Sequence, residues 1–133
     1  MAFITIVDNE CITVQYLPDK KIIYHTVHKP ISGQPLREAL WAGTQALRQY
    51  GATKWLSDDR KNGPLSPEDA EWGVEWSRQT VASGWKYWAI VVPEAIEAAG
   101  SLSPAISSLH QLGLQMRIFS LLEDAFAWLD SVE

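Results

Sequence analysis

Cysteine, basic residues and long apolar runs are all scarce in this chain, and each scarcity excludes a class of protein. The single cysteine, Cys11, cannot form a disulfide within the chain, which is typical of a reducing compartment. Eleven basic against 16 acidic residues give a net charge of −5, which argues against a nucleic-acid partner. No apolar run has the length of a membrane span, and the N-terminus lacks the basic start of a signal peptide. We therefore expect a cytoplasmic protein without a membrane span.

Common catalytic and cofactor motifs are missing as well. No glycine-rich phosphate loop and no Gly-x-Ser-x-Gly sequence follows any expected strand. His25 and His28 lie three residues apart on an expected strand, so they point to opposite faces and are poorly placed to chelate one metal ion. Cys11 lies in an alternating pattern that is typical of a small buried side chain. The sequence thus predicts no catalytic residue, no metal and no cofactor.

The chain does contain the pattern of an α/β protein. Its 133 residues fit a single domain covering 1–133. The expected strands cover 3–7, 11–17, 21–27, 54–57, 87–92 and 115–119. The expected helices cover 36–50, 67–81, a broken segment at 94–99 and 104–112, and the residues after Ser120. This order predicts an N-terminal β-meander followed by alternating α/β units, which form a mixed, mostly parallel sheet packed with about four helices.

Several residues predict where the helices begin and end. Gly51 is a C-terminal stop for the first helix, and Gly43 on its apolar stripe suggests close approach to the sheet. Ser66 before Pro67 predicts an N-cap for the second helix. The run from Ser120 to Glu123 has the form of a capping box for the last helix. Two inward faces are open for that helix: Phe126 with Leu129, or Ala125 with Trp128.

Five segments together carry a resemblance to a known group. They are Ile22-Ile23-Tyr24 with Gly33, Lys54 to Asp59, Leu65 to Asp69 with Trp72, Ala89 to Pro93, and Phe119 with Glu123-Asp124-Ala125 and Trp128-Leu129. The chain resembles the SpoIIAA-like superfamily, which includes anti-sigma-factor antagonists and STAS domains, and in particular its small stand-alone bacterial proteins. The resemblance implies a SpoIIAA-like α/β fold, a non-enzymatic regulatory or protein-interaction role and a homodimer.

In the antagonist branch of that superfamily, a serine within an Asp-Ser-Ser-Gly-like run is phosphorylated. This chain lacks the run, and Ser66 is the nearest counterpart by position. Glu68 and Asp69 would repel a phosphate there, although a helix N-terminus favours one. We therefore expect Ser66 to be a plain N-cap.

The carboxyl end of the strand at 54–57 and the helix start that follows form the candidate interaction surface. Ligands and partners of open α/β sheets usually bind at such strand ends. Asp58 and Asp59 are neighbours on an extended strand and point to opposite faces, so we expect solvation or pairing with Arg60 or Lys61 instead of joint acid–base chemistry. The candidate residues are Ser57, Asp58, Asp59, Arg60, Ser66, Glu68 and Asp69.

Seven tryptophans are a large number for this length, and they allow two interpretations. Most are expected in the core, because a sheet flanked by helices needs large side chains to fill the space. The other interpretation is that some of them line an aromatic pocket or an interface, where tryptophan is enriched. The candidates for that role are Trp41, Trp72, Trp76 and Trp85, and among them Trp41 and Trp85 are expected to be the most exposed.

Three functions are open at this point. The first is a non-enzymatic interaction module, expected to be a homodimer with a protein partner. The second is a binder of a small apolar molecule or lipid, which rests on the tryptophans and on a looser likeness to CRAL-TRIO lipid-binding domains. The third is an enzyme that uses Asp58 or Asp59 with a histidine.

Overall fold

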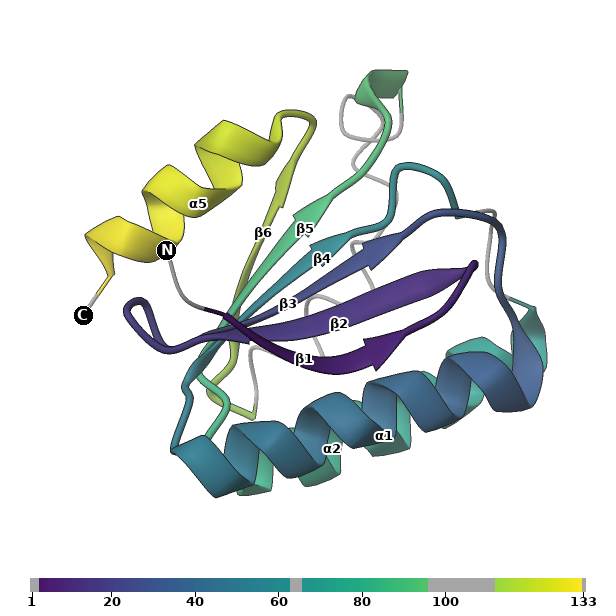
Figure 1. Ribbon diagram of the computed structural model, residues 1–133, viewed down its shortest axis with the longest axis horizontal. Helices are drawn as coiled ribbons and strands as arrows, with labels where there is room; N and C mark the ends of the chain where they lie inside the picture. The colour runs from purple at the N-terminus through teal and green to yellow at the C-terminus, as the bar shows by residue number, and fades with distance from the viewer. Residues whose placement is uncertain (1–2, 63–65, 96–111, 133) are drawn as a thin grey trace.

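Six strands form one sheet in the order of the sequence (Figure 1). The computed structural model describes residues 3–62, 66–95 and 112–132. The strands are β1 (Ile4–Asp8), β2 (Ile12–Leu17), β3 (Ile22–Val27), β4 (Lys54–Asp58), β5 (Tyr87–Val91) and β6 (Gln115–Phe119). The pairs β1–β2 and β2–β3 are antiparallel, and every later pair is parallel. The predicted meander and mixed, mostly parallel sheet are therefore confirmed.

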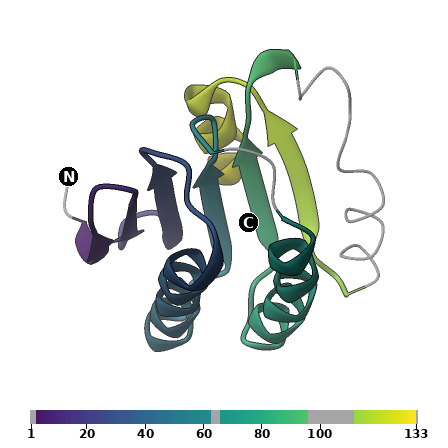
Figure 2. The same ribbon diagram turned by 90° about the vertical axis from the view of Figure 1, so that its right-hand side faces the viewer.

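Two helices cover one face of the sheet, and a third covers the other (Figure 1). The helices α1 (Gly33–Tyr50) and α2 (Pro67–Ala82) lie side by side, as Figure 2 shows along their axes, and α5 (Leu122–Ser131) lies opposite. The part of the chain that the structure describes thus has three helices, not the four predicted. The broken helix expected over 94–112 lies mostly outside the described residues.

Local signals set most helix boundaries. Gly51 ends α1 in the left-handed conformation, at φ 66°, and the Oγ of Ser66 accepts the backbone N–H of Asp69 at the start of α2. The capping box predicted at Ser120 is wrong. The N-cap of α5 is Leu121, and its side chain makes no capping bond. The helix begins one residue too late for Ser120 to reach the N–H of Glu123, as a capping box requires.

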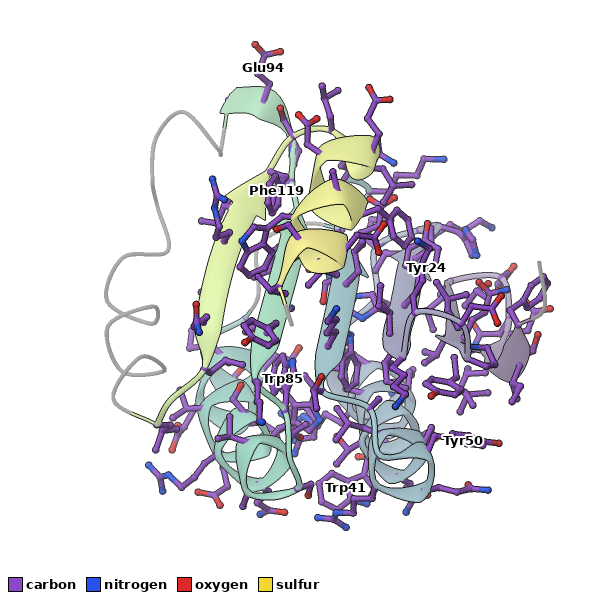
Figure 3. All side chains as sticks on the ribbon, turned by 90° about the vertical axis from the view of Figure 1, so that its left-hand side faces the viewer. Tyr24, Trp41, Tyr50, Trp85, Glu94 and Phe119 are labelled. Atoms are coloured by element: carbon purple, nitrogen blue, oxygen red, sulfur yellow. The ribbon has the colours of Figure 1, made fainter. Side chains whose placement is uncertain are left out.

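Tryptophans fill the space between the sheet and the α1–α2 pair. Trp55 from β4 contacts Trp76 from α2 and Trp85, with ring centroids 5.1 and 5.6 Å away. A Cβ placed on Gly43 of α1 would lie 2.5 Å from the Trp55 ring, so close approach requires glycine there, as predicted. Trp85 is only 1% exposed, and Figure 3 shows it near the helix pair. The prediction that it is exposed was wrong, because the segment after α2 turns inward to enter β5.

A smaller apolar layer joins α5 to the other face of the sheet. Ala125 and Leu129 are fully buried, in a cluster that includes Leu56 of β4. Neither predicted inward face is right, because the buried pair takes one residue from each. Lys54 at the start of β4 donates to the carbonyl of Leu129 at 2.6 Å and so satisfies the end of α5. No helix in the described ranges is long and apolar enough to cross a membrane.

Candidate functional site

The two aspartates at the end of β4 have different partners. Asp58, whose side chain is 7% exposed, forms a bidentate ion pair with Arg60. The Nε of Arg60 donates to Oδ1 at 2.9 Å and its Nη2 donates to Oδ2 at 2.7 Å. The hydrogen bond to Asp58 is the main cause that raises the pKa of Arg60 above its ordinary value, against the opposing effect of burial. The expected pairing with Arg60 is thus present for Asp58.

Asp59 contacts a buried histidine instead. The Nε2 of His25 lies 2.8 Å from Oδ1 of Asp59, and the indole Nε1 of Trp55 donates to Nδ1 of the same ring at 3.0 Å. An indole N–H only donates, so Nδ1 accepts and the ring proton lies on Nε2, which donates to Asp59. Both ring nitrogens of His25 are engaged, and the side chain is only 5% exposed. The imidazole holds Trp55 and Asp59 in place.

Asp69 joins the starts of the two neighbouring helices. Its Oδ2 accepts the backbone N–H of Gly33 at 3.0 Å, and its Oδ1 lies 3.1 Å from Nη2 of Arg37. These bonds explain why α1 begins at Gly33, three residues before the predicted start at Leu36. The hydrogen bond from Gly33, followed by those from Arg37 and Ser66, holds the pKa of Asp69 below its ordinary value, although burial opposes the shift.

The predicted interaction surface is therefore divided between the interior and the surface. Ser57 is fully buried and accepts the indole N–H of Trp88 at 2.8 Å. Asp58 and Asp69 are buried as well, with exposed fractions of 5% and 3%. The remaining candidates keep contact with solvent, and they are Asp59, Arg60, Ser66 and Glu68.

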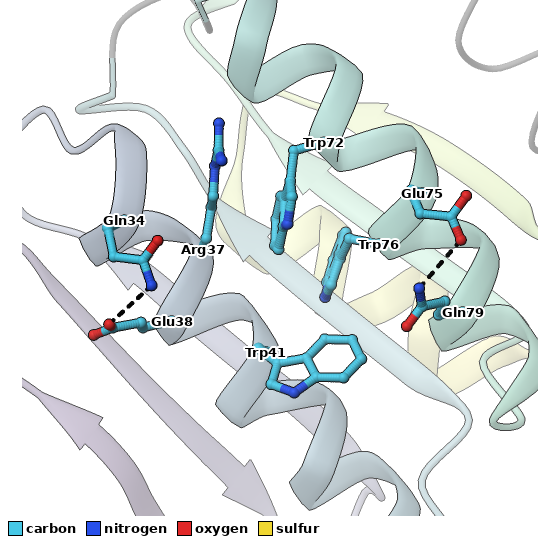
Figure 4. Close-up of a pocket in the computed structure, with 8 residues that line it drawn as sticks. All are labelled: Gln34, Arg37, Glu38, Trp41, Trp72, Glu75, Trp76 and Gln79. Carbon is cyan, nitrogen blue, oxygen red and sulfur yellow. Dashed lines mark hydrogen bonds between the residues drawn. The ribbon is translucent and has the colours of Figure 1, made fainter.

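An open groove of about 360 Å³ lies between α1 and α2 (Figure 4). A second hollow, of about 390 Å³, shares Arg37, Trp72 and Glu75 with it and extends to Glu68 and Glu71. We call the two together the aromatic groove. Its residues are Gln34, Arg37, Glu38, Trp41, Glu68, Glu71, Trp72, Glu75, Trp76 and Gln79.

The floor of the aromatic groove is held in place by contacts within the protein. The rings of Trp72 and Trp76 stack with centroids 6.1 Å apart and planes 13° apart. The Cζ of Arg37 lies 5.8 Å from the centre of Trp72, so three flat groups follow one another in Figure 4. The indole of Trp76 donates to the Oγ1 of Thr44 at 2.8 Å, which fixes the deepest ring. These contacts hold Arg37 and the two rings in one defined arrangement.

The structure gathers three of the four predicted pocket tryptophans. Trp41, Trp72 and Trp76 line the groove, whereas Trp85 lies beneath it in the core. Sequence reasoning named Glu68 but missed Arg37 and three other glutamates that line the groove, Glu38, Glu71 and Glu75. One signal was available: Arg37 and Trp41 are four residues apart on one helix, and Trp72 and Trp76 are four apart on the next. Only the packing of α1 beside α2 shows that these two pairs of side chains line the same groove.

Comparisons with known proteins assign no family to the chain. No protein-family model matches it, and no curated protein or solved structure matches it either. Among the described residues, no three His, Cys, Asp or Glu side chains gather in a way that would hold a metal ion.

Proposed function

We propose that this chain is a non-enzymatic interaction module of the SpoIIAA-like type that binds a protein partner through the aromatic groove. The sequential sheet and the α/β units after the meander support the SpoIIAA-like resemblance. The observation that carries the proposal is the half-buried pair Trp41 and Trp72, held beside Arg37 in an open groove. Tryptophan and arginine dominate the binding energy of protein interfaces, and a preordered surface loses little entropy on binding.

The geometry favours a protein partner over a small apolar molecule or lipid. Small-ligand sites usually enclose most of the ligand in an apolar cavity. Here the tryptophan floor is open, and charged side chains such as Arg37, Glu38 and Glu75 line it. A lipid tail placed in this groove would leave much of its surface in water and would desolvate those charges.

The geometry at the end of β4 argues against catalysis by Asp58, Asp59 or His25. Asp58 is paired with Arg60, and His25 uses both ring nitrogens within the protein. A general base needs a nitrogen or oxygen that can reach the substrate proton. His25 would have to release Trp55 or Asp59 before it could act as one.

Site-specific photo-crosslinking in the cells that naturally express the protein tests this proposal. A photoreactive benzoylphenylalanine replaces Gln79 in the groove, and in the matched control it replaces the exposed Asp19 on the β2–β3 turn. We expect one adduct of defined mass from position 79, none from position 19, and loss of the adduct when Trp72→Ala is added. Equal labelling at both positions, or an adduct unaffected by Trp72→Ala, would contradict the proposal.

The mass of the same adduct tests the homodimer that the resemblance implies. A homodimer formed through this groove gives an adduct of twice the chain mass, 14.9 kDa per copy. An adduct of another mass identifies a different protein as the occupant, and native mass spectrometry of the purified chain then shows whether it dimerises elsewhere.

A further inference from the structure

We infer that the partner segment bound by the aromatic groove is basic and places arginine or lysine side chains on the tryptophan floor. This inference rests on the proposed function and names the chemistry of the partner. It follows from the charges around the groove, the apolar floor and the length of the surface.

The rim of the aromatic groove is strongly acidic. Four glutamates line it, and they are Glu38, Glu68, Glu71 and Glu75. Among the described residues that line the groove, Arg37 is the only basic one, and its charge is offset by the buried carboxylate of Asp69 at 3.1 Å. An acidic surface attracts basic partners and repels acidic ones, which sets both partner choice and association rate.

Other polar groups near the rim leave this acidity largely in place. Glu75 contacts Arg78 of its own helix. In Figure 4, Glu75 also accepts from Gln79, and Glu38 accepts from Gln34. The Glu75–Arg78 pair is exposed on both sides, and exposed pairs of this kind are weak and exchange readily. Arg48 lies 5.6 Å from the centre of Trp41 and donates to Ser83.

The apolar floor distinguishes this surface from a merely acidic patch. Arginine and lysine carry an apolar stem and a charged head, so a surface with indole rings below and carboxylates above matches both parts. The protein already uses this arrangement internally. Arg37 places its guanidinium carbon over Trp72 and pairs the same group with the carboxylate of Asp69.

The length of the acidic rim indicates a polypeptide and not an isolated small cation. Glu68, Glu71 and Glu75 follow one another at helical spacing along α2. Seven residues of α-helix span about 10 Å, which is enough for several side chains of an extended or helical segment. A segment with basic residues along one side can engage the glutamates while its stems cover Trp41 and the part of Trp72 left exposed between Arg37 and Trp76.

Nuclear magnetic resonance of the seven tryptophan indole N–H groups tests the inference. The probe is a synthetic twelve-residue peptide with three arginines on one side, and the control peptide has citrulline, the neutral isostere, at the same positions. We expect the arginine peptide to shift the Trp41 and Trp72 signals and to leave that of Trp128, half-buried on the opposite face, unchanged. Single tryptophan-to-phenylalanine variants assign the signals. No shift with the arginine peptide, or equal shifts with the citrulline peptide, would overturn the inference.

Charge reversal at the rim provides the matched protein variants. The double variant Glu71→Lys with Glu75→Lys should weaken binding of the arginine peptide about tenfold or more, because it replaces attraction by repulsion at close range. The control, Asp19→Lys with Asp124→Lys, reverses two exposed charges on the β2–β3 turn and on α5, so it changes the net charge by the same amount outside the groove and should change binding little. If both variants weakened peptide binding equally, the effect would come from the net charge of the protein, and a defined binding site would be contradicted.

The two experiments separate failure of this inference from failure of the proposed function. An adduct from position 79 together with no binding of the arginine peptide would mean that the groove binds a partner of another chemistry. The absence of any adduct from position 79 would contradict the proposed function itself, because no partner would then bind at the groove.

Discussion

The end of β4 and the aromatic groove use their polar side chains in opposite ways. At the end of β4, Asp58, Asp59 and His25 have their partners within the protein. In the groove, the glutamates of the rim, such as Glu71, are exposed above a tryptophan floor. The contrast teaches that charged residues at the end of a strand are a poor guide to a binding site, because such groups often pair with other side chains of the same protein. Substitutions should therefore cost stability in the first region and binding in the second.

The largest effect is expected from Trp55, which joins the two regions from within the core. Trp55→Ala would leave a cavity among buried rings and remove the N–H that His25 accepts. We expect a loss of about 3–5 kcal/mol in the free energy of unfolding, typical of a buried aromatic residue replaced by alanine. Urea unfolding followed by circular dichroism measures this loss. The half-buried Trp128 of α5 is the control, and an equal loss for Trp128→Ala would contradict the special position of Trp55.

Gly43→Ala should cost less but act through the same ring. Alanine gains about 0.5–1 kcal/mol in helix propensity, and overpacking a core costs about 1–3 kcal/mol. The added Cβ would lie 2.5 Å from Trp55, whose ring is buried and bonded to His25, so the ring has little room to move. We expect net destabilisation, read from the shift of the urea midpoint. Gly73→Ala on α2, where no atom of a described residue lies within 4 Å of the new Cβ, should instead be stabilising.

Asp69, which joins the starts of α1 and α2 beside the groove, should give a pH-dependent effect. Its hydrogen bonds hold the folded-state pKa below the unfolded value of about 3.9, so its contribution to stability is fully present above that value. The contribution is lost as the pH falls through the lower, folded-state pKa. Asp69→Asn should therefore be less stable than the wild type at pH 7, and the difference in melting temperature should shrink below about pH 4. A constant difference down to pH 2 would show that the charge of Asp69 is not the cause.

The smallest effect on stability is expected in the groove. Glu71→Lys changes an exposed side chain, so the free energy of unfolding should stay within about 0.5 kcal/mol of the wild type. Binding of the arginine peptide should fall in the same variant. A stability loss comparable to that of Gly43→Ala would mean that the rim is part of the fold and not a free surface.

Much of the fold was predictable because its signals are local. Alternation marked the strands of the meander, a continuous apolar run marked β5, Gly51 ended α1 by its left-handed backbone, and Ser66 capped α2 as expected. The errors arose where distant residues decide a boundary. Asp69 extends α1 to Gly33 from another helix, and the start of α5 at Leu122 leaves Ser120 outside the cap.

The candidate site was predictable only in part. Sequence alone marked the tryptophans and the acidic segment after β4, and it fixed the acidic character of the chain. Tertiary structure decided which of these groups face solvent. Trp85 is buried and Asp58 pairs with Arg60, while Trp41 and Trp72 line one groove from two different helices. The physical reason is that secondary structure follows from neighbours along the chain, whereas burial and pairing depend on how separate elements pack, which local sequence does not encode.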